Sequence, residues 1–406
     1  MLPPNATFEA VSGRRYVVRR HLAQGGQGVA YVVEDAAGRQ FVMKVLEGEF
    51  QPAVMKLRVQ LLIRRRLHAR SPTLCADIDL VDQGGMLATI APLAQGESLA
   101  SLLENRPLPL LQSLQVGCAI AQGIAVLEEL TIAHGDLHAG NVMVHVDREA
   151  VRSVQLIDFG NFVAPEAPAP PCFGQAYYLA PEIRLEGRLP DMFSDRYALA
   201  TLLHEVVLLK HPAAGFEDSY DRAVAEWLHD PARCSSCDRA SGGYAAEILN
   251  ADLARLFRLG VSASRLTRPA ASAWAETLAD AMYRVSTCPN CGAPAIVDSS
   301  KTACPACRRP YPTLLLRTPQ GTVPLVASAT VIGREELGND PSISRRHAII
   351  RRQGPDYVLE DQSTNGTYRQ TKTGWTRLEN RSPLPLVQAG DVLRFAAVGT
   401  SLEMMP

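Results

Sequence analysis

The segment from His134 to Gly160 constrains this chain more than any other. It reads His134-Gly-Asp-Leu-His-Ala-Gly-Asn141, and Asp158-Phe-Gly160 follows after a short strand-like stretch. Asp136 stands five residues before Asn141, and the second aspartate completes an ordered set of polar side chains. Phosphoryl transfer needs metal ligands and a carboxylate near the attacking hydroxyl, and these side chains supply both.

A glycine-rich turn lies upstream, within Leu22-Ala-Gln-Gly-Gly-Gln-Gly-Val-Ala-Tyr-Val-Val33. The strand-like run Phe41-Val-Met-Lys-Val-Leu46 follows it. Glycines let backbone N–H groups approach phosphate oxygens without obstruction by a Cβ, and Lys44 on the next strand can reach the same phosphates. Alone this is a weak signal, because surface hairpins also use glycine. Joined to the downstream set, it predicts phosphoryl transfer.

These motifs, with Ala180-Pro-Glu182, Asp195 and Arg268 behind them, resemble the eukaryotic-like protein kinase family over about 270 residues. The resemblance implies a bilobal protein-kinase fold over residues 12–285, with an N-lobe at about 12–94 and a C-lobe at about 95–285. It also implies ATP and Mg²⁺ as cofactors. Its scaffold contacts would be Glu182 with Arg268, and Asp195 with the catalytic loop.

The family's functional residues carry over by motif. Asp136 would be the catalytic base, Lys44 would bind the α- and β-phosphates, and Asn141 and Asp158 would hold Mg²⁺. The remaining nucleotide-binding positions are three glycines of the turn and two residues of the hinge, namely Gly25, Gly26, Gly28, Ala91 and Ala94. If Ala91 lines the back of the adenine pocket, that pocket is unusually roomy.

Two departures from the family concern the activation segment. Gly135 replaces the arginine that usually receives a phosphate, and residues 161–181 contain no Ser or Thr. We therefore expect activity that does not require Ser/Thr phosphorylation of this segment.

Two further departures lie near the substrate. His138 and Gln175 replace a lysine and a threonine that contact the catalytic aspartate in the family. The form of the motif with His138 also resembles aminoglycoside phosphotransferases. A small-molecule kinase and a catalytically impaired scaffold therefore stand beside the protein Ser/Thr kinase.

The stretch after Lys44 departs further. From Gln51 to Ala76 there is no Asp or Glu, so the expected partner of Lys44 is missing. Gln60 or Arg58 could occupy its register, or Glu49 could reach in, and the sequence does not decide. The same stretch is basic and reads either as a solvated helix face or as a docking surface for an acidic or phosphorylated partner. Its cations are Lys56, Arg58, Arg64, Arg65, Arg66 and Arg70.

Two CxxC pairs predict a zinc site. Cys288 and Cys291 are separated by twelve residues from Cys304 and Cys307, and four thiolates in this spacing suit tetrahedral Zn²⁺. With all four positions filled by protein, the metal would be structural, and residues 286–312 resemble a small zinc ribbon. A single further pair, Cys234 and Cys237, would hold a metal or remain unliganded thiols.

Residues 313–406 alternate apolar and polar side chains between turns, which is typical of a small β-sandwich. Gly333-Arg334, Ser344-Arg-Arg-His347 and Ser363-Thr-Asn-Gly-Thr367 place anion-binding side chains on its loops. These motifs resemble the forkhead-associated (FHA) domain, which recognises phosphothreonine peptides. The resemblance implies that His347 stabilises the loops and that five residues bind the peptide: Arg334, Ser344, Arg345, Thr364 and Asn365.

Composition bounds the remaining possibilities. Forty-one Lys+Arg against 42 Asp+Glu give a net charge of −1, which provides no global basic field for nucleic acid. The start of the chain lacks a signal peptide, and we expect a multi-domain α+β protein of the cytoplasm without a membrane anchor. The domain arrangement resembles bacterial Ser/Thr kinases of tellurite-resistance-associated clusters. That resemblance implies protein substrates, a von Willebrand A-type protein and a metal-dependent phosphatase as partners.

The reader domain also needs a phosphorylated target. It would bind a phosphothreonine on a product, on a partner or on this chain. The candidate autophosphorylation sites surround the ribbon and are Ser286, Thr287, Ser299, Ser300, Thr302 and Thr313.

Overall fold

The computed structural model describes residues 1–25, 28–48, 51–148, 150–170, 174–213, 243–288, 290–297, 303–310, 314–325, 327, 329–353, 356–380, 384–388 and 390–404. Several residues singled out above lie outside these ranges: Gly26, Glu49, Cys234, Cys237, Ser299, Ser300, Thr302 and Thr313. The chain forms two compact units, one of residues 1–243 with 256–275 and one of residues 244–255 with 276–406.

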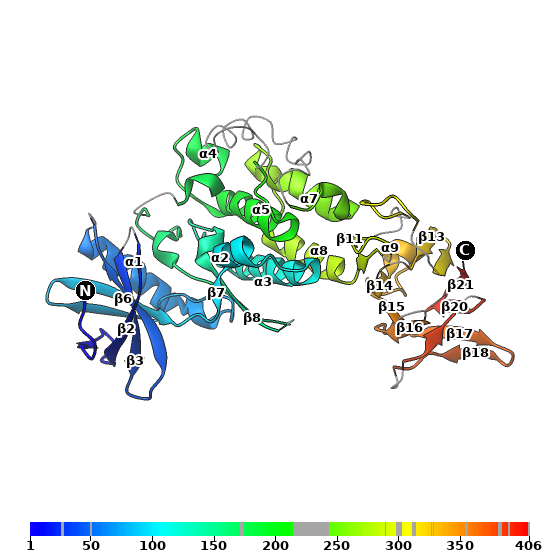
Figure 1. Cartoon of the computed structure of the whole chain (residues 1–406), viewed down its shortest axis with the longest axis horizontal. Helices are drawn as coiled ribbons and strands as arrows, with labels where there is room; N and C mark the ends of the chain where they lie inside the picture. Colours follow the sequence, from blue (N-terminus) through cyan, green and yellow to red (C-terminus); the bar gives the residue numbers. More distant parts are fainter. Residues whose placement is uncertain are drawn as a thin grey trace. The chain divides into compact units, whose positions relative to one another are not determined.

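The first unit begins with a six-stranded antiparallel sheet in the order β1-β2-β3-β4-β6-β5, drawn in blue in Figure 1. Its strands are β1 (Thr7–Glu9), β2 (Arg15–Gly25), β3 (Gly28–Asp35), β4 (Gln40–Leu46), β5 (Asp79–Gln83) and β6 (Met86–Pro92). Alternate residues such as Tyr16, Tyr31 and Met43 form its core, as the period of two in a strand requires. Helix α1 (Pro52–Arg65) packs through Met55 and Val59.

The same unit continues as a mainly helical lobe. Its elements are α2 (Leu99–Asn105), α3 (Leu110–Glu129), the sheet β7 (Glu97–Ser98), β8 (Val142–Asp147) and β9 (Ala150–Leu156), α4 (Pro181–Arg184), α5 (Met192–Leu208), and parts of α7 (Ala251–Gly260) and α8 (Ala271–Met282). Helix α5 starts at a capping box, in which Asp191 accepts from two backbone N–H groups and Ser194 accepts from the N–H of Asp191. This start fixes where Asp195 lies.

Helix α3 is the central element of this lobe. Among the described residues it alone is long and apolar enough to cross a membrane, and 61% of its apolar window is buried within the protein. Such burial is typical of a core helix, and α3 contacts α5 and β9 along its length.

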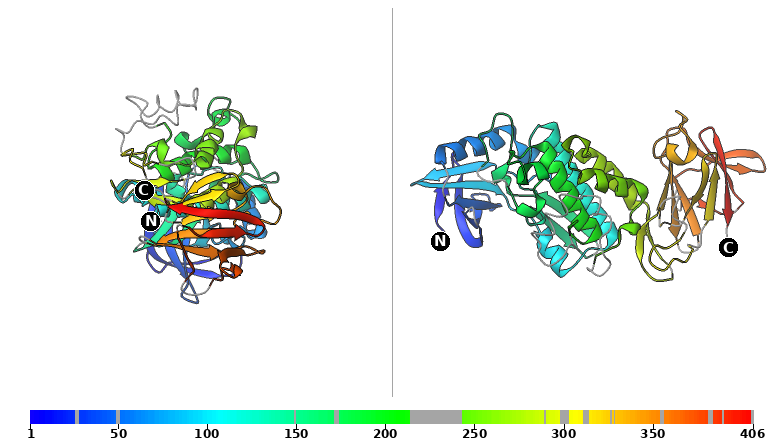
Figure 2. Two further views of the ribbon diagram at one scale, coloured as in Figure 1. Left: turned by 90° about the vertical axis from the view of Figure 1, so that its right-hand side faces the viewer. Right: turned by 90° about the horizontal axis from the view of Figure 1, so that it is seen from above.

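The second unit carries a short hairpin and a β-sandwich, the latter drawn in orange and red in Figure 2. The hairpin is β10 (Val285–Thr287) with β11 (Pro294–Ile296). One sheet has the order β13-β12-β21-β20-β17-β18 and the other β14-β15-β16-β19. Leu316, Ile332, Ile350, Leu359 and Phe395 belong to the core between the sheets. The sandwich that the alternation predicted is confirmed.

The strands of the sandwich are bounded as follows. They are β12 (Leu314–Thr318), β13 (Gly321–Pro324), β14 (Ala329–Ile332), β15 (Ala348–Gln353), β16 (Asp356–Asp361), β17 (Thr367–Thr371), β18 (Gly374–Arg377), β19 (Leu386–Val387), β20 (Val392–Phe395) and β21 (Val398–Met404). A one-turn helix, α9 (Arg334–Leu337), follows β14.

Candidate functional site

A cleft of about 1050 Å³ lies between the sheet and the helical lobe of the first unit. The residues predicted to bind nucleotide or to act in catalysis line it, apart from Gly26, which is outside the described residues. They are Gly25, Gly28, Lys44, Ala91, Ala94, Asp136, Asn141 and Asp158. Ala91 lies on β6 opposite Val42 of β4 and lines the cleft with a small side chain.

Lys44 and Asp158 contact each other directly across this cleft. Lys44 Nζ lies 2.7 Å from Asp158 Oδ2, although 114 residues separate them in sequence. Burial raises the pKa of the Asp158 carboxyl, but the nearby Lys44 ammonium and the N–H of Gly160 outweigh burial, and the net pKa is lowered. Asp158 is therefore an ionised oxygen ligand at neutral pH.

Asp136 is held by three neighbours. Asn161 Nδ2 donates to its Oδ2 at 3.1 Å, and the backbone N–H of Gln175 donates to its Oδ1 at 3.1 Å. His138 Nε2 lies 3.6 Å from the same Oδ1. The side chain of Asn141 donates to the backbone carbonyl of Asp136 at 2.9 Å. Each carboxylate oxygen of Asp136 thus accepts one hydrogen bond, which fixes the orientation of the carboxylate.

His138 faces Asp136 in a defined protonation state. The N–H of Gly140 donates to Nδ1 at 3.0 Å, so a neutral ring carries its proton on Nε2, toward the carboxylate. Burial lowers the pKa of His138 despite the opposing pull of Asp136 and Asp158. A neutral donor thus replaces the family's lysine, and Gln175 contributes its backbone rather than its side chain.

Asn161 is a functional residue that the sequence reasoning missed. It directly follows the Asp158-Phe-Gly160 motif, is 1% exposed and bonds the predicted catalytic carboxylate. Its backbone also explains Gly135, which has φ +76° and whose added Cβ would lie 2.3 Å from the Asn161 carbonyl oxygen. A polar residue following that motif is the one signal that could have identified it.

Asp195 of α5 holds the backbone of the catalytic loop. Its carboxylate accepts the N–H of His134 at 2.5 Å and the N–H of Gly135 at 3.1 Å. This confirms the expected capping of the loop. Burial raises the pKa of Asp195 to about 7 despite these two donors. The His134 ring packs on Phe159 with centroids 4.7 Å apart, which joins the loop to the Asp158 motif.

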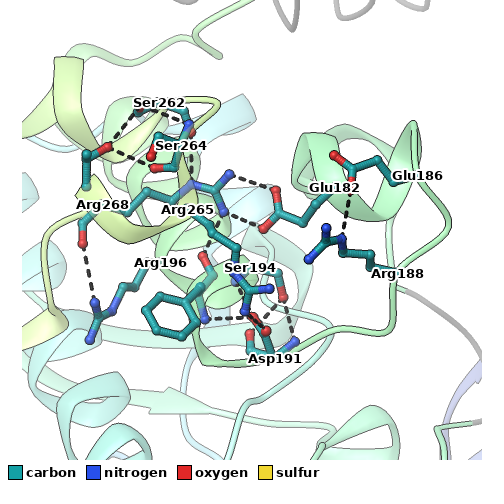
Figure 3. A network of polar contacts seen from close by, with 12 residues as sticks. Glu182, Glu186, Arg188, Asp191, Ser194, Arg196, Ser262, Ser264, Arg265 and Arg268 are labelled. Carbon is teal, nitrogen blue, oxygen red and sulfur yellow. Dashed lines mark hydrogen bonds and ion pairs between the residues drawn. The ribbon is translucent and has the colours of Figure 1, made fainter.

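Glu182 and Arg268 form the expected ion pair, shown in Figure 3. Two guanidinium nitrogens each donate to a carboxylate oxygen at 2.7 Å, and the two side chains are 7% and 0% exposed. Arg268 also donates to the carbonyls of Ser262 and Phe193, each at 2.9 Å. The guanidinium and the carboxylate of this buried pair therefore both have hydrogen-bond partners.

Of the two candidates on helix α1 for the partner of Lys44, Arg58 lies at the cleft. The buried residues of α1 are Met55, Arg58, Val59 and Leu62, and Arg58 also lines the cleft, whereas Gln60 does not. Arg58 donates to backbone carbonyls of residues 160–168 instead of contacting Lys44. Glu49, the third candidate, lies outside the described residues.

A carboxylate near Lys44 comes from a different element. Asp77, in the stretch before β5, lines the cleft beside Lys44 and Thr89, which are cross-strand neighbours on β4 and β6. Burial raises the pKa of Asp77 to about 7, against the lowering effect of the Thr89 hydroxyl and of Lys44. Sequence reasoning missed it because the stretch searched for a carboxylate, Gln51 to Ala76, ended one residue before it.

The basic stretch of α1 is neither a uniform solvated face nor a free docking surface. Lys56 pairs with Asp82, Arg65 pairs with Glu166, and Arg58 is buried. Arg64 is exposed and has a long contact of 3.4 Å with Gln60. The cations therefore divide between internal partners and solvent.

The four ribbon cysteines of the second unit converge. All four Sγ atoms lie within 4.8 Å of one another, with Cys288–Cys307 and Cys291–Cys304 separations of 3.7 Å. Zn–S bonds of about 2.3 Å in a tetrahedron require sulfur separations of about 3.8 Å. Backbone turns support each pair, since Gly292 N–H bonds Cys288 O at 2.9 Å and Arg308 N–H bonds Cys304 O at 2.8 Å. The donor set fits zinc.

The side chains predicted to bind the phosphopeptide lie in two connections of the sandwich, β14–β15 and β16–β17. Arg345, Thr364 and Asn365 are exposed, whereas Arg334 and Ser344 are half-buried. Arg334 Nε donates to Ile343 O at 2.6 Å, and a Cβ at Gly333 would lie 1.9 Å from Arg345 O. The loops therefore pack closely, with an exposed cation at their tip.

His347 connects two of these loops. The buried ring lies with Nε2 3.1 Å from Gly366 O and accepts the Ser344 N–H on Nδ1 at 3.4 Å. Asn365 Nδ2 donates to Ser342 O at 2.7 Å, which joins the same loops a second time. This is the loop-stabilising position that the resemblance implied for His347.

Comparison with known proteins gives two family matches. The protein kinase domain matches residues 16–239, and the FHA domain matches residues 330–396. The zinc ribbon rests on the cysteine cluster alone, and neither match bears on a link to tellurite resistance.

Curated relatives are bacterial kinases. "Serine/threonine-protein kinase pkn2" of Myxococcus xanthus is 28% identical over 53% of this chain and 26% of its own length. "Serine/threonine-protein kinases PknA" of Corynebacterium glutamicum is 26% identical over 54% of this chain and 48% of its own length. "Serine/threonine-protein kinase PknA" of Mycobacterium tuberculosis is 26% identical over 50% of this chain and 48% of its own length. The chain thus spans half or less of these relatives. Since the kinase match covers more than half of its 406 residues, this chain belongs to the protein kinase family and carries an FHA domain beyond it.

Proposed function

We propose that this chain is a protein serine/threonine kinase that uses ATP and Mg²⁺ and reads phosphothreonine through its FHA domain. The observation that carries the proposal is the convergence of Lys44, Asp136, Asn141 and Asp158 on one cleft, with the Lys44–Asp158 contact of 2.7 Å. The names of the relatives favour serine and threonine as acceptors.

The residues of the cleft fit these cofactors. Asp158 offers an ionised carboxylate and Asn141 an amide oxygen, and hard oxygen donors suit Mg²⁺. Bound at these residues, the metal would neutralise charge on the transferring phosphoryl group. Lys44 would bind the phosphates, and the N–H groups around Gly25 and Gly28 would lie over them. Ala91 and Ala94 would contact the adenine.

Asp136 would act on the acceptor. Asn161 and the N–H of Gln175 occupy one oxygen each and hold the carboxylate plane, and His138 is close enough to bond it when the site tightens. An oriented carboxylate can take the proton of a substrate hydroxyl as it attacks the γ-phosphorus. No Lys–Glu pair on α1 enters this assignment, because α1 contains no Asp or Glu.

The zinc ribbon would be structural. Four thiolates at tetrahedral separations leave no coordination position for a substrate. A segment of about 27 residues is too short for a hydrophobic core, so metal binding would provide its folding free energy.

The sandwich would bind phosphothreonine with Arg334, Ser344, Arg345, Thr364 and Asn365. Among the described autophosphorylation candidates, Thr287 is exposed, whereas Ser286 is 5% exposed. Thr287 is therefore the better acceptor of the two. A von Willebrand A-type partner, a phosphatase partner and a cytoplasmic location remain proposals from the resemblance.

A transfer assay tests the kinase assignment. The purified full chain is incubated with labelled ATP·Mg²⁺ and either mixed protein acceptors or aminoglycosides. Asp136→Ala and, as a matched control, the exposed Asp147→Ala are treated in the same way. We expect protein labelling by wild type and Asp147→Ala only. Labelling of aminoglycosides but not of proteins would establish the small-molecule alternative, and ATP binding without any transfer would establish the scaffold.

Titration calorimetry tests the reader. A phosphothreonine peptide should bind the full chain and its unphosphorylated form should not. Arg345→Ala should abolish binding, whereas Lys372→Ala, an exposed cation on the β17–β18 turn, should leave it unchanged. Equal binding by both variants would refute the assignment of the loops.

A further inference from the structure

Arg58 of α1 is buried without a carboxylate partner in any contact that the described residues make with it. It is 1% exposed, and its guanidinium donates to three backbone carbonyls of one segment: Gly160 at 3.1 Å, Phe162 at 2.5 Å and Pro168. Its Cζ also lies 4.5 Å from the centroid of the Phe162 ring. All of these acceptors belong to the stretch that follows Asp158.

A buried cation needs such contacts. Burial lowers the pKa of Arg58 to about 10, which still leaves the guanidinium charged at neutral pH. Leaving a charge desolvated without hydrogen bonds is strongly unfavourable, so the carbonyls of residues 160–168 replace its hydration. Displacement of either α1 or the segment would remove this compensation, and the two therefore stabilise one another.

Arg65 makes a second connection from the same helix. It lies seven residues, or about two turns, after Arg58, so both project toward one side of α1. Its guanidinium pairs with Glu166 of the same segment and donates to the carbonyl of Leu130 at the end of α3 at 3.0 Å. Helix α1 is thus joined to the segment at its middle and at its C-terminal end, and also to the helical lobe.

The segment so held leads directly to the catalytic carboxylate. Val163 pairs with Ala133, with both N–H···O distances at 2.8 Å, just before the catalytic loop. Asn161 of the same segment donates directly to Asp136 at 3.1 Å. Residues that fix the segment therefore act on the position of Asp136 through Asn161 and the Val163–Ala133 pairing.

We infer that Arg58 and Arg65 form an arginine clamp that holds the activation segment in its working arrangement without a phosphate. The inference rests on the proposed kinase function and identifies the positioning residues that make segment phosphorylation dispensable. Residues 161–181 offer no Ser or Thr, and Gly135 offers no cation to receive a phosphate, so the built-in cations of α1 take over that task.

The test uses the full chain, with exchange of the segment amides and steady-state kinetics as readouts. The variants are Arg65→Ala, Glu166→Gln, Arg58→Lys and the charge swap Arg65→Glu/Glu166→Arg. Arg64→Ala is the matched control, because it removes an exposed arginine from the same helix. Hydrogen exchange of residues 160–170 is followed by mass spectrometry, and kcat is determined separately from the KM for ATP.

We expect faster exchange in the segment by about tenfold for Arg58→Lys and about threefold to tenfold for Arg65→Ala. The value of kcat should fall by similar factors while the KM for ATP changes by less than about threefold, because Lys44 and the glycines are untouched. Arg64→Ala should match wild type within about twofold, and the charge swap should recover most of the loss caused by Arg65→Ala.

Two results would overturn the clamp: segment exchange that is unchanged in Arg58→Lys and Arg65→Ala, or the same acceleration in Arg64→Ala. A wild-type chain that transfers no phosphate would overturn the proposed function, while the exchange data would still decide on the clamp. If Arg58→Lys does not fold, the more exposed Arg65–Glu166 pair decides through its swap.

Discussion

Removing Arg268 should destabilise the kinase domain severely. Arg268→Met would delete two hydrogen bonds of 2.7 Å to Glu182 and one each to Ser262 and Phe193 at 2.9 Å. The carboxylate of Glu182 would then stay buried without its cation. Breaking a buried pair in this way costs about 3–5 kcal/mol, and at about 2–4 °C per kcal/mol for a domain of this size Tm should fall by on the order of 10 °C.

The assay is thermal unfolding of the full chain, in which the fully buried Trp274 reports on the helical lobe. Arg188→Met is the matched control, because Arg188 and Glu186 form a pair in the same region (Figure 3). Their side chains are each 55% exposed. Exposed pairs contribute about 0–1 kcal/mol, so this variant should lose at most a few degrees. Equal losses of Tm in the two variants would refute the reasoning.

The pH dependence adds a second check on the same pair. Burial would raise the pKa of Glu182, but its hydrogen bonds with Arg268 outweigh burial and lower it. The folded chain therefore holds this proton less tightly than the unfolded chain. The stabilisation is present above the unfolded pKa of about 4.3 and is lost as the pH falls through the lower folded pKa. The gap in Tm between wild type and Arg268→Met should narrow in acid.

Three further predictions concern the ribbon, the cleft and a buried carboxyl. Elemental analysis should find one zinc per chain in the wild type and none in Cys304→Ser. The backbone amides of residues 285–297 and 303–310 should exchange hydrogen faster in Cys304→Ser, because metal binding provides the folding free energy of the ribbon. A ribbon that stays folded without metal would contradict this. Ala91→Phe should weaken bulky purine-based inhibitors by about tenfold or more in a competition assay while the KM for ATP changes less, and unchanged inhibition would place Ala91 away from the pocket. Burial raises the pKa of Glu205 to about 7. Between about pH 4.3 and 7 the folded chain therefore holds a proton that the unfolded chain has released. The stability of the wild type should fall as the pH rises through that window. Glu205→Gln should remove this part of the fall, which unfolding at pH 5 and pH 8 would show, and an unchanged slope would refute it.

The fold and much of the site could be predicted because the motifs encode groups that must meet. Lys44 and Asp158 are 114 residues apart, yet their motifs, and the family resemblance that those motifs carry, assigned both to one nucleotide site. The cysteines were predictable for a similar reason, since two CxxC turns each direct two thiolates to one point. Asp195 followed from its motif position on a helix whose start is fixed by Asp191.

Sequence reasoning missed features that depend on how side chains from distant elements are directed toward one another. Asn161 bonds Asp136 across 25 residues, and Gln175 does so with a backbone N–H that any residue would offer. Asp77 lines the cleft but lies one residue beyond the stretch from Gln51 to Ala76 in which a carboxylate was sought. The basic stretch of α1 was interpreted by charge alone, whereas burial separates Arg58 from the exposed Arg64.

Phosphosite mapping on wild type and Asp136→Ala after incubation with ATP·Mg²⁺ tests the central claim most directly. The kinase assignment predicts phosphate on Ser or Thr of the wild-type chain or of an added protein acceptor, and none of it with Asp136→Ala. Equal phosphate in both samples, or ATP binding by wild type with no Ser or Thr modified in any protein acceptor, would contradict the account.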